Sequence, residues 1–460
     1  MRTPNLPSRD RLLQTLRTTP RRSSTELSFE LGISVQSVRR LLDELPENMV
    51  LKAGQTRRAR YALRRPLRGT MENLALYSID EAGQAHSAGQ LALVQPQGTL
   101  LPLEKTAWPV PAESRDGWWG GLPYPIFAVR PNGYMGRRFA RAEYLTLGVS
   151  EDPEEWSDDD ILWALSQRGS DLVGNLLLGN PAYELWLKNK IQGQKPLPNA
   201  TLPAAYAQFA GQAVAVAGGG SSAAGEFPKF AAIRELDGAL TPHVLVKFSG
   251  ASGSAAEQRW GDLLVCEHLA LECVRQLEGI NAARSRILSH EGRVFIEVER
   301  FDRVGHHGRI SLCGLDAIQP TFLGGRATEW PEVIGRLHHM GHVDVASVAN
   351  VERLWWFGRL IANTDMHLRN LSFHAEHTLR LAPVYDMLPM TFAPLAGGEV
   401  PPRNFVPALP LPPQREVWLT ACAVAISFWT AAATDTRISE AFRAICRANA
   451  ERLRDLAAQV

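Results

Sequence analysis

Residues 360–373 read LIANTDMHLRNLSF, and residues 383–389 read PVYDMLP. Asp365 and Asn370 lie five positions apart in the first segment, and Asp386 lies twenty-one positions after Asp365. Phosphoryl transfer needs one carboxylate that accepts the proton of the attacking hydroxyl. It also needs an Asn carbonyl and a second carboxylate that hold magnesium against the nucleotide phosphates. Protein kinases use the same D-x4-N spacing before a later metal-binding Asp, so the spacing predicts a phosphoryl-transfer site.

The neighbouring segments add weight to this interpretation, because D-x4-N alone occurs by chance in many long chains. Residues 351–361 read VERLWWFGRLI, an apolar run typical of a buried helix. Residues 371–373 and 379–384 are strand-like. We therefore expect buried elements, rather than a loose surface loop, to hold the polar residues in place.

The pattern N-T-D-x-H-x-R-N, followed by P-x-Y-D-x-L-P, resembles the signature of the HipA family of serine/threonine kinases of bacterial toxin–antitoxin systems. The resemblance implies an α+β, protein-kinase-like fold of two lobes that uses ATP and Mg²⁺. It implies that Asp365 accepts the substrate proton and that Asn370 and Asp386 hold the metal. His367 and Arg369 would support the loop or the transferred phosphoryl group. Arg369 replaces the Lys usual in the family and keeps its charge.

Length and composition indicate a multidomain globular protein. The chain has 460 residues, of which 45% are hydrophobic, and this length accommodates about two to four domains. Its five cysteines form no C-x-x-C pair, and residues 1–20 are polar and Arg-rich, without a signal-peptide core. We expect a reducing, cytoplasmic setting. Residues 417–434 are uncharged, and their Ala, Ser and Thr content favours a buried helix over a membrane span.

The near-neutral total charge hides an asymmetry. Residues 1–70 contain fifteen Lys and Arg against six Asp and Glu, a net charge of +9, whereas the remaining residues carry −8. A basic N-terminal block on a mildly acidic body suggests a nucleic-acid-binding module joined to a second unit.

Three short helices are expected in this block, at residues 9–17, 23–32 and 34–45. Gly32 is placed to form the turn between the last two, and Ser34 to cap the third. This order is that of a helix-turn-helix, whose second helix enters the major groove by its N-terminal half. The groove-side candidates are Ser34, Gln36, Ser37, Arg39 and Arg40.

Residues 50–63 then predict two short strands around residues 53–55, which would form a basic wing. The candidate phosphate contacts on this wing are Lys52, Arg57, Arg58 and Arg60. Together, residues 1–68 resemble a winged helix-turn-helix domain that binds DNA. The alternatives are a solvated basic helical hairpin and a module for protein contacts.

A linker around Pro66 and Gly69 should follow, at residues 66–72. Residues 73–200 mix strands, such as 77–79 and 91–94, with helices. One helix is expected from Asp158 to Arg168, capped by Ser157 or an adjacent Asp. In its pattern this segment is similar to the N-terminal subdomain of HipA-like kinases.

Residues 213–230 read AVAVAGGGSSAAGEFPKF, a Gly/Ser-rich turn between apolar segments. It lacks the Gly-Lys-Ser/Thr of a Walker A loop, and from its composition it could be either a linker or a phosphate-binding loop. Its S-x-A-G-x-x-x-K pattern resembles the phosphate loop of the HipA family. The resemblance implies nucleotide contacts from Ser222, Ala223, Ala224, Gly225 and Lys229. It also implies autophosphorylation of Ser222, with the adjacent Ser221 as the alternative.

Two further segments fit a kinase N-lobe of residues 201–310. Residues 243–249 form an apolar strand carrying Lys247, the residue type that kinases place against the nucleotide phosphates. The alternative is a solvated lysine on an edge strand. Glu267 lies on a predicted helix over 255–277, where it could pair with a cation; we assign it no catalytic role.

Residues 286–303 predict a hairpin that turns at Glu291-Gly292 and ends in E-R-F-D-R, a second resemblance to the HipA family. The resemblance implies that the backbone of Glu299 and Phe301 holds adenine. The charged members of the motif, Arg300, Asp302 and Arg303, are expected to form ion pairs that join the lobes.

Residues 311–460 would form a helical C-lobe. The whole sequence therefore predicts an ATP- and Mg²⁺-dependent serine/threonine kinase of the HipA toxin type, growth-inhibiting and self-phosphorylating, with its own DNA-binding domain. This domain order resembles the YjjJ-type members of the family. Its partners would be DNA, a protein substrate such as a component of the translation machinery, and an antitoxin. The alternative is a DNA-binding transcriptional regulator with a nucleotide-sensing, kinase-like body; a toxin acting on DNA itself has no nuclease motif to support it.

Overall fold

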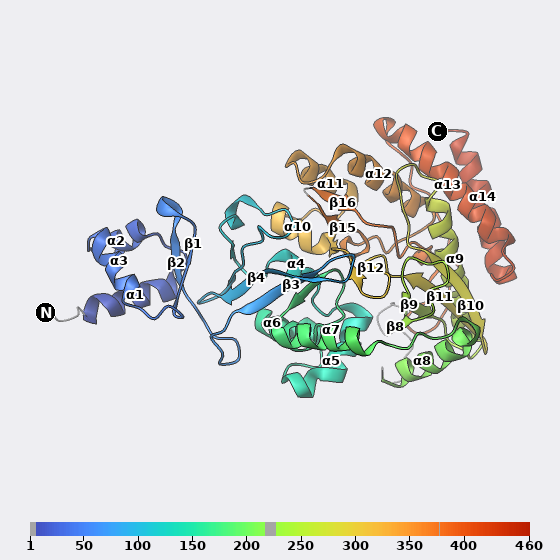
Figure 1. Ribbon diagram of the computed structural model, residues 1–460. Helices are drawn as coiled ribbons and strands as arrows, with labels where there is room; N and C mark the ends of the chain where they lie inside the picture. The colour runs from blue at the N-terminus through green and yellow to red at the C-terminus, as the bar shows by residue number, and fades with distance from the viewer. Residues whose placement is uncertain (1–5, 217–226, 377) are drawn as a thin grey trace.

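The N-terminal region consists of three helices and a two-stranded hairpin (Figure 1). The computed structural model describes residues 6–216, 227–376 and 378–460. Ser23 and Glu26 form a capping box at the start of α2, and Gly32 ends that helix with a φ of +67°. The bounds are α1 Leu6–Thr18, α2 Ser24–Leu31, α3 Val35–Asp43, β1 Val50–Ala53 and β2 Arg60–Leu63. This is the predicted element order, although the loop between the strands is longer than expected and contains the 3-10 turn Thr56–Arg58.

The hairpin packs directly on the next part of the chain. Leu51 and Ala62 of the hairpin form one buried apolar cluster with Ala92, Val94 and Trp118. Backbone hydrogen bonds from Arg65 to the Leu93 carbonyl and from Gln95 to the Leu63 carbonyl extend the contact. The hairpin is therefore already packed on the middle sheet before the predicted linker at residues 66–72 begins.

A five-stranded antiparallel sheet organises the middle of the chain, in the order β6-β5-β4-β3-β7. Ser157 caps α6 through a capping box with Asp160, and α6 begins and ends at the predicted residues. The strands are β3 Leu74–Ile79, β4 Ala85–Leu93, β5 Thr99–Leu100, β6 Trp118–Trp119 and β7 Leu176–Leu178. The helices are α4 Tyr124–Ala128, α5 Gly133–Leu147, α6 Asp158–Arg168 and α7 Asn180–Gln192.

A second antiparallel sheet, in the order β10-β11-β9-β8, lies between two helices. Its side chains alternate: Val244, Val246 and Phe295 pack towards α8, whereas Ile296 packs on the opposite side with residues of α9. Glu291 and Gly292 form the predicted turn, both with positive φ. The bounds are α8 Leu202–Val216, β8 Lys229–Ile233, β9 His243–Phe248, α9 Ala255–Val274, β10 Ser285–His290 and β11 Arg293–Glu299.

Helices dominate the C-terminal part, which surrounds a small sheet in the order β14-β15-β16. Trp330, Phe357, Trp418, Phe428 and Trp429 are fully buried in its core. The helices are α10 Leu315–Leu323, α11 Trp330–His339, α12 Val345–Leu360, α13 Arg415–Thr434 and α14 Glu440–Ala457. The strands are β12 Arg303–Val304, β13 Gly308–Arg309, β14 Cys313–Gly314, β15 Ser372–Ala375 and β16 Leu379–Leu381. The predicted mixture of helix and sheet is confirmed.

Helix α13 is the one helix in the described part of the chain whose length and apolar composition would allow it to cross a membrane. Half of its apolar window is buried, and it packs on α9, α12 and α14 (Figure 1). These contacts are those of a core helix, as its composition indicated.

Glu297 provides a test of how the β10-β11-β9-β8 sheet is held to α8. Its carboxylate is 1% exposed and accepts hydrogen bonds from Tyr206 Oη at 2.6 Å, Arg234 Nε at 2.9 Å and Arg286 Nε at 2.9 Å. Glu297→Ala should lower the free energy of unfolding by about 3–5 kcal/mol, because it removes the carboxylate that two arginines share, leaves Glu299 to pair with Arg234, and removes the acceptor of the buried Tyr206 hydroxyl. The measurement is urea denaturation of the full chain.

The matched control is Glu376→Ala, which removes an exposed pair with Arg380. This control should change the free energy of unfolding by less than about 0.5 kcal/mol. Equal effects of the two substitutions would contradict a structural role for the buried carboxylate.

Candidate active site

A buried ion pair lies at the centre of the site. Strand β9 directs Lys247 towards α9, where its Nζ donates to Glu267 Oε1 at 2.7 Å and to Oε2 at 2.9 Å. The Lys247 side chain is 4% exposed and that of Glu267 is 1% exposed. Lys247 also donates to Asp386, which arrives from the C-terminal part of the chain. The predicted phosphate lysine and metal aspartate therefore meet in one place.

The charges in this cluster support one another. Burial favours the neutral forms of Lys247 and Asp386, but their attraction outweighs it. The two carboxylates raise the pKa of Lys247 above its usual value. Burial alone would raise the pKa of Asp386, but the positive charges of Lys247 and Lys229 lower it to about 2. Asp386 is consequently an anion at neutral pH, the form that a metal ligand requires.

Asp386 is held in an unusual backbone conformation. Its φ is +54°, in the left-handed region that non-glycine residues rarely adopt. The neighbouring Tyr385 hydroxyl lies 2.7 Å from Ser372 Oγ and donates to the Arg369 carbonyl at 2.5 Å. This phenol thus ties the Asp386 loop to the loop that carries Asp365. Strained backbone of this kind persists where the surrounding structure fixes it, often at functional sites.

The loop at residues 363–370 is fixed from within. The Asp365 backbone N–H donates to Asn363 Oδ1 at 3.0 Å, and Asn370 Nδ2 donates to the Asp365 carbonyl at 2.7 Å. Asn370 is buried, whereas the Asp365 carboxylate is 48% exposed. The carboxylate is therefore accessible to a substrate hydroxyl. The side-chain oxygen of Asn370, Oδ1, makes no hydrogen bond within the described residues, so it is available to bind a metal ion.

His367 and Arg369 differ in position. His367 Nε2 lies 3.5 Å from Asp365 Oδ1, beside the proposed proton acceptor. Arg369 Nε lies 3.5 Å from Asp316 Oδ2, and Asp316 also pairs with Arg130. His367 is thus placed to act on Asp365, and Arg369 anchors the loop to α10.

The predicted hinge lies at the end of β11. The Glu299 N–H already donates to the Arg284 carbonyl, and its carboxylate pairs with Arg234 at 3.0 Å. The Phe301 N–H makes no backbone hydrogen bond within the described residues, and the Phe301 ring lies 5.6 Å from the ring of Tyr385. Of the two backbone amides, that of Phe301 is the one available to a purine ring.

Only one residue of the predicted phosphate loop can be placed. Lys229 begins β8 directly opposite Lys247 in the strand pairing, and its charge lowers the pKa of Asp386. The other predicted residues of the loop lie outside the described residues: Ser221, Ser222, Ala223, Ala224 and Gly225.

The arrangement fits Mg²⁺ held partly by a nucleotide. Asp386 and Asn370 supply hard oxygen donors, and no cluster of three or more His, Cys, Asp or Glu side chains that would hold a metal occurs in the described residues. Magnesium typically takes one or two protein oxygens and completes its shell with phosphates and water. The small number of protein ligands therefore suits this ion.

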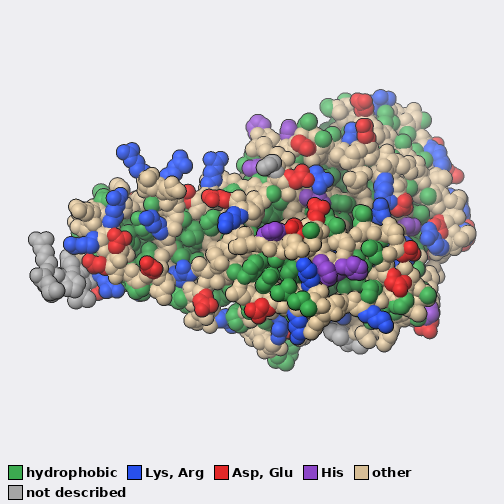
Figure 2. All heavy atoms as spheres, viewed as in Figure 1, with side chains coloured by type: hydrophobic (Ala, Val, Ile, Leu, Met, Phe, Trp, Pro, Cys, Tyr) green, Lys and Arg blue, Asp and Glu red, His purple; other side chains and the backbone are tan. Residues whose placement is uncertain are grey.

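The predicted DNA-contact residues fall into two groups. Gln36, Arg39, Lys52, Arg57 and Arg58 are exposed, and Figure 2 shows basic side chains projecting from the N-terminal region. The others have internal contacts: Ser34 caps α3 through the Ser37 N–H, Arg40 lies 3.7 Å from Glu44, and Arg60 pairs with Glu26 at 2.5 Å. Phosphate contact by Arg60 stays a prediction, and its guanidinium would have to share Glu26 of α2 with the phosphate.

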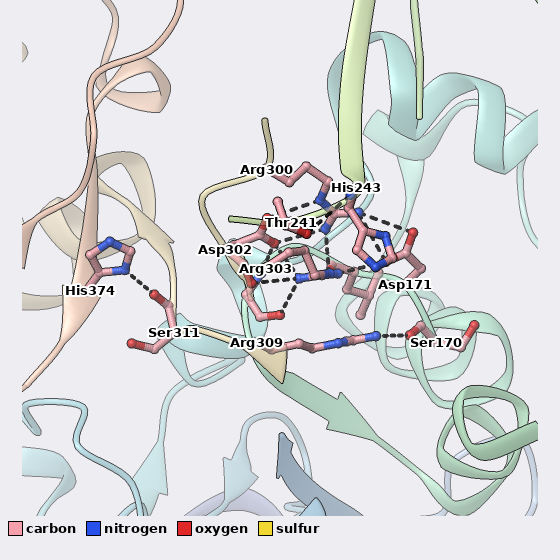
Figure 3. A network of polar contacts seen from close by, with 12 residues as sticks. Ser170, Asp171, Thr241, His243, Arg300, Asp302, Arg303, Arg309, Ser311 and His374 are labelled. Atoms are coloured by element: carbon pink, nitrogen blue, oxygen red, sulfur yellow. Dashed lines mark hydrogen bonds and ion pairs between the residues drawn. The ribbon is translucent and has the colours of Figure 1, made fainter. Parts of the chain in front are cut away.

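The E-R-F-D-R arginines form ion pairs, as expected, but with an unexpected partner. Arg300 and Arg303 both pair with Asp171, which follows α6, and Asp302 accepts the Gly174 N–H at 2.8 Å (Figure 3). The network therefore joins the β11 end to the middle of the chain rather than joining the two lobes.

Two residues gain a role that sequence reasoning did not assign. Glu267 is the partner of Lys247, and Tyr385 ties the two loops together. A carboxylate within the apolar run LLVCEHLAL of α9 was the available signal for Glu267, because buried acids require a partner. No comparable signal marked the Tyr385 hydroxyl.

Comparison with known proteins identifies the family of the chain. Residues 70–187 match the family described as YjjJ-like toxin, middle domain, and residues 221–455 match the HipA-like C-terminal domain. The toxin YjjJ of Escherichia coli strain K12 is 37% identical over 441 residues, covering 95% of this chain and 96% of that protein.

Two solved structures are more distant. The Shewanella oneidensis MR-1 complex of HipA, HipB and operator DNA matches at a TM-score of 0.49 and 15% identity, over 84% of this chain and 97% of that one. The Helicobacter pylori proinflammatory kinase CtkA matches at a TM-score of 0.34 and 12% identity, over 50% of this chain and 88% of that one. On the family matches and the full-length relative, the chain belongs to the YjjJ-like toxins, which carry a HipA-like C-terminal domain.

Proposed function

We propose that the protein is an ATP- and Mg²⁺-dependent serine/threonine kinase. The observation that carries the proposal is the buried Lys247–Glu267 pair in contact with Asp386. Protein kinases require a strand lysine paired with a helix glutamate, together with a metal-binding aspartate. A purely structural ion pair would not need the strained Asp386 loop beside it.

Each of the described site residues has a separate role in the proposed phosphoryl transfer. Asp365 accepts the proton of the substrate hydroxyl as that oxygen attacks the γ-phosphorus and the bond to the ADP oxygen breaks. Asn370 and Asp386 hold Mg²⁺, which neutralises phosphate charge when bound. Lys247, held in position by Glu267, contacts the nucleotide phosphates, and the Phe301 amide positions adenine. His367 orients the Asp365 carboxylate.

The biological setting follows from the family. We propose a growth-inhibiting toxin that acts in the cytoplasm on a protein substrate, such as a component of the translation machinery, and that an antitoxin restrains. Ser222, or Ser221 beside it, is the proposed site of autophosphorylation. The alternative function, a transcriptional regulator whose body senses nucleotide without transferring phosphate, predicts nucleotide binding without catalysis.

Phosphate incorporation tests the kinase proposal. Purified protein incubated with γ-labelled ATP and Mg²⁺ should label itself at Ser222 or Ser221. Asp365→Asn should lower the rate by at least about a hundredfold, because general-base catalysis contributes about 10²–10⁴-fold. ATP binding by both proteins with labelling of neither would support the regulator instead.

Glu267→Gln tests the role of the buried pair. A neutral amide cannot hold the Lys247 charge, so Lys247 would pair with Asp386 alone and compete with the metal. The labelling rate at fixed Mg²⁺ should fall about tenfold or more, since charged hydrogen bonds of this kind are worth about 1.5–3 kcal/mol. Glu272→Gln, an exposed site on the same helix, is the control. An unchanged rate in Glu267→Gln would show that the pair is only structural.

We also propose that the N-terminal region binds DNA. The exposed basic candidates lie on α3, on β1 and in the hairpin loop, the elements that a winged helix-turn-helix turns to the groove and the phosphates. Gln36 and Arg39 are the proposed groove contacts. Lys52, Arg57 and Arg58 are the proposed phosphate contacts.

Salt dependence tests this interface. Each phosphate contact contributes about 0.9 to the slope of log K against log salt concentration. The double substitution Arg57→Gln, Arg58→Gln should therefore reduce the slope by about two, measured by fluorescence anisotropy with duplex DNA. Lys105→Gln, an exposed site in the middle of the chain, should leave the slope unchanged. Equal slopes for the double variant and the wild-type protein would rule out phosphate contact by this loop.

A further inference from the structure

A cavity lies next to the Arg300 and Arg303 side chains, beside the hinge, and the catalytic-loop and metal-site candidates do not line it. Its volume is about 260 Å³. Helix α7 forms one wall, strand β8 another, and the segment that follows β11 a third. Lys247, Asp365, Asn370 and Asp386 do not line it. The cavity therefore needs an explanation of its own.

Its lining is strongly cationic. Four basic side chains line it: Lys190, Arg300, Arg303 and Arg309. Asp171 in the lining and Asp302 beside it carry the opposing charge (Figure 3), which leaves an excess of two positive charges among these described residues. Three histidines, His243, His306 and His307, complete the same wall. Charge of one sign around a concave surface raises the local concentration of the opposite ion.

One arginine has unused hydrogen-bonding capacity. Arg309 is 5% exposed; its Nη2 donates to the Ser170 carbonyl at 2.6 Å, whereas its buried Nη1 has no partner within the described residues. A buried donor without an acceptor is costly and needs an explanation. Burial, reinforced by the neighbouring Arg303, also lowers the pKa of Arg309 to about 9. An anion beside this guanidinium would satisfy both its charge and its free N–H.

We propose that this cavity binds a small phosphate-bearing molecule. A phosphate dianion matches the two excess positive charges, and arginine forks bind phosphate oxygens in pairs. The volume is below the roughly 300–1,000 Å³ of sites for larger ligands, which fits a phosphomonoester or free phosphate. Lys190, whose Nζ donates to the Gly83 carbonyl at 2.5 Å, adds a fourth basic donor to the lining.

Two arginines of the proposed phosphate site also border the hinge. Arg300 and Arg303 flank Phe301, whose amide is the proposed adenine contact, and both arginines also hold Asp171. An anion that competes with Asp171 for these arginines would change the position of the hinge relative to the middle of the chain. Binding at this cavity is independent of kinase activity and can be measured without it.

The test is isothermal titration calorimetry, in which inorganic phosphate is titrated into the full-length protein in chloride buffer of constant ionic strength. Wild-type protein should bind one equivalent saturably. Lys190→Gln should weaken binding at least about threefold, and Arg309→Gln about tenfold or more, because each removes a charged donor. Lys188→Gln, the same charge change two positions away on α7 at an exposed site that does not line the cavity, should bind as wild type.

Three outcomes would overturn the proposal. They are the absence of saturable binding by wild type, equal affinities of Lys190→Gln and Lys188→Gln, and loss of binding in Lys229→Gln with full retention in Lys190→Gln. The last would assign the phosphate to the nucleotide site. Because Lys190 is only half-buried, the comparison of the two lysine variants decides the question even where Arg309→Gln fails to fold. A parallel titration with phenyl phosphate distinguishes a phosphomonoester site from one specific to free phosphate.

Discussion

The structure depends on one buried contact between opposite charges, that of Lys247 with Glu267 and Asp386. Taking an ammonium and two carboxylates out of water is unfavourable unless each is paired. The pairing requires strand β9, helix α9 and the Asp386 loop to meet at one point, and these come from three separate parts of the chain. Satisfying these charges therefore fixes how the sheet, its helix and the C-terminal part are assembled.

A second charged network lies at the end of β11. Asp302 is 4% exposed and holds Arg300, Arg303 and the Gly174 N–H, so the end of β11 is tied to the segment after α6. The hinge is thus held by ion pairs rather than by apolar packing alone, and its position depends on the charges around it.

The sequence predicted the parts of this structure that depend on local pattern. Helix α6, with its capping residue Ser157, and the turn at Glu291-Gly292 follow from neighbouring residues, and both are confirmed. Sequence reasoning also assigned Lys247 and Asp386 to the same nucleotide site, and the structure brings these two side chains into contact. Contacts between distant segments were not predictable: the Glu267 partner, the Arg60–Glu26 pair and the attachment of Arg300 to Asp171 each depend on tertiary placement. Periodicity shows which face of a helix is buried, but it does not identify the charge that meets it.

The apolar junction between the hairpin and the middle sheet has a consequence for dividing the chain. Leu51 and Ala62 cover Ala92, Val94 and Trp118, so the first 65 residues shield part of the following domain from water. A truncated protein lacking them would expose the Trp118 indole and the side chains of Ala92 and Val94, an apolar surface prone to self-association. The N-terminal region therefore covers apolar surface of the middle sheet as well as presenting basic side chains.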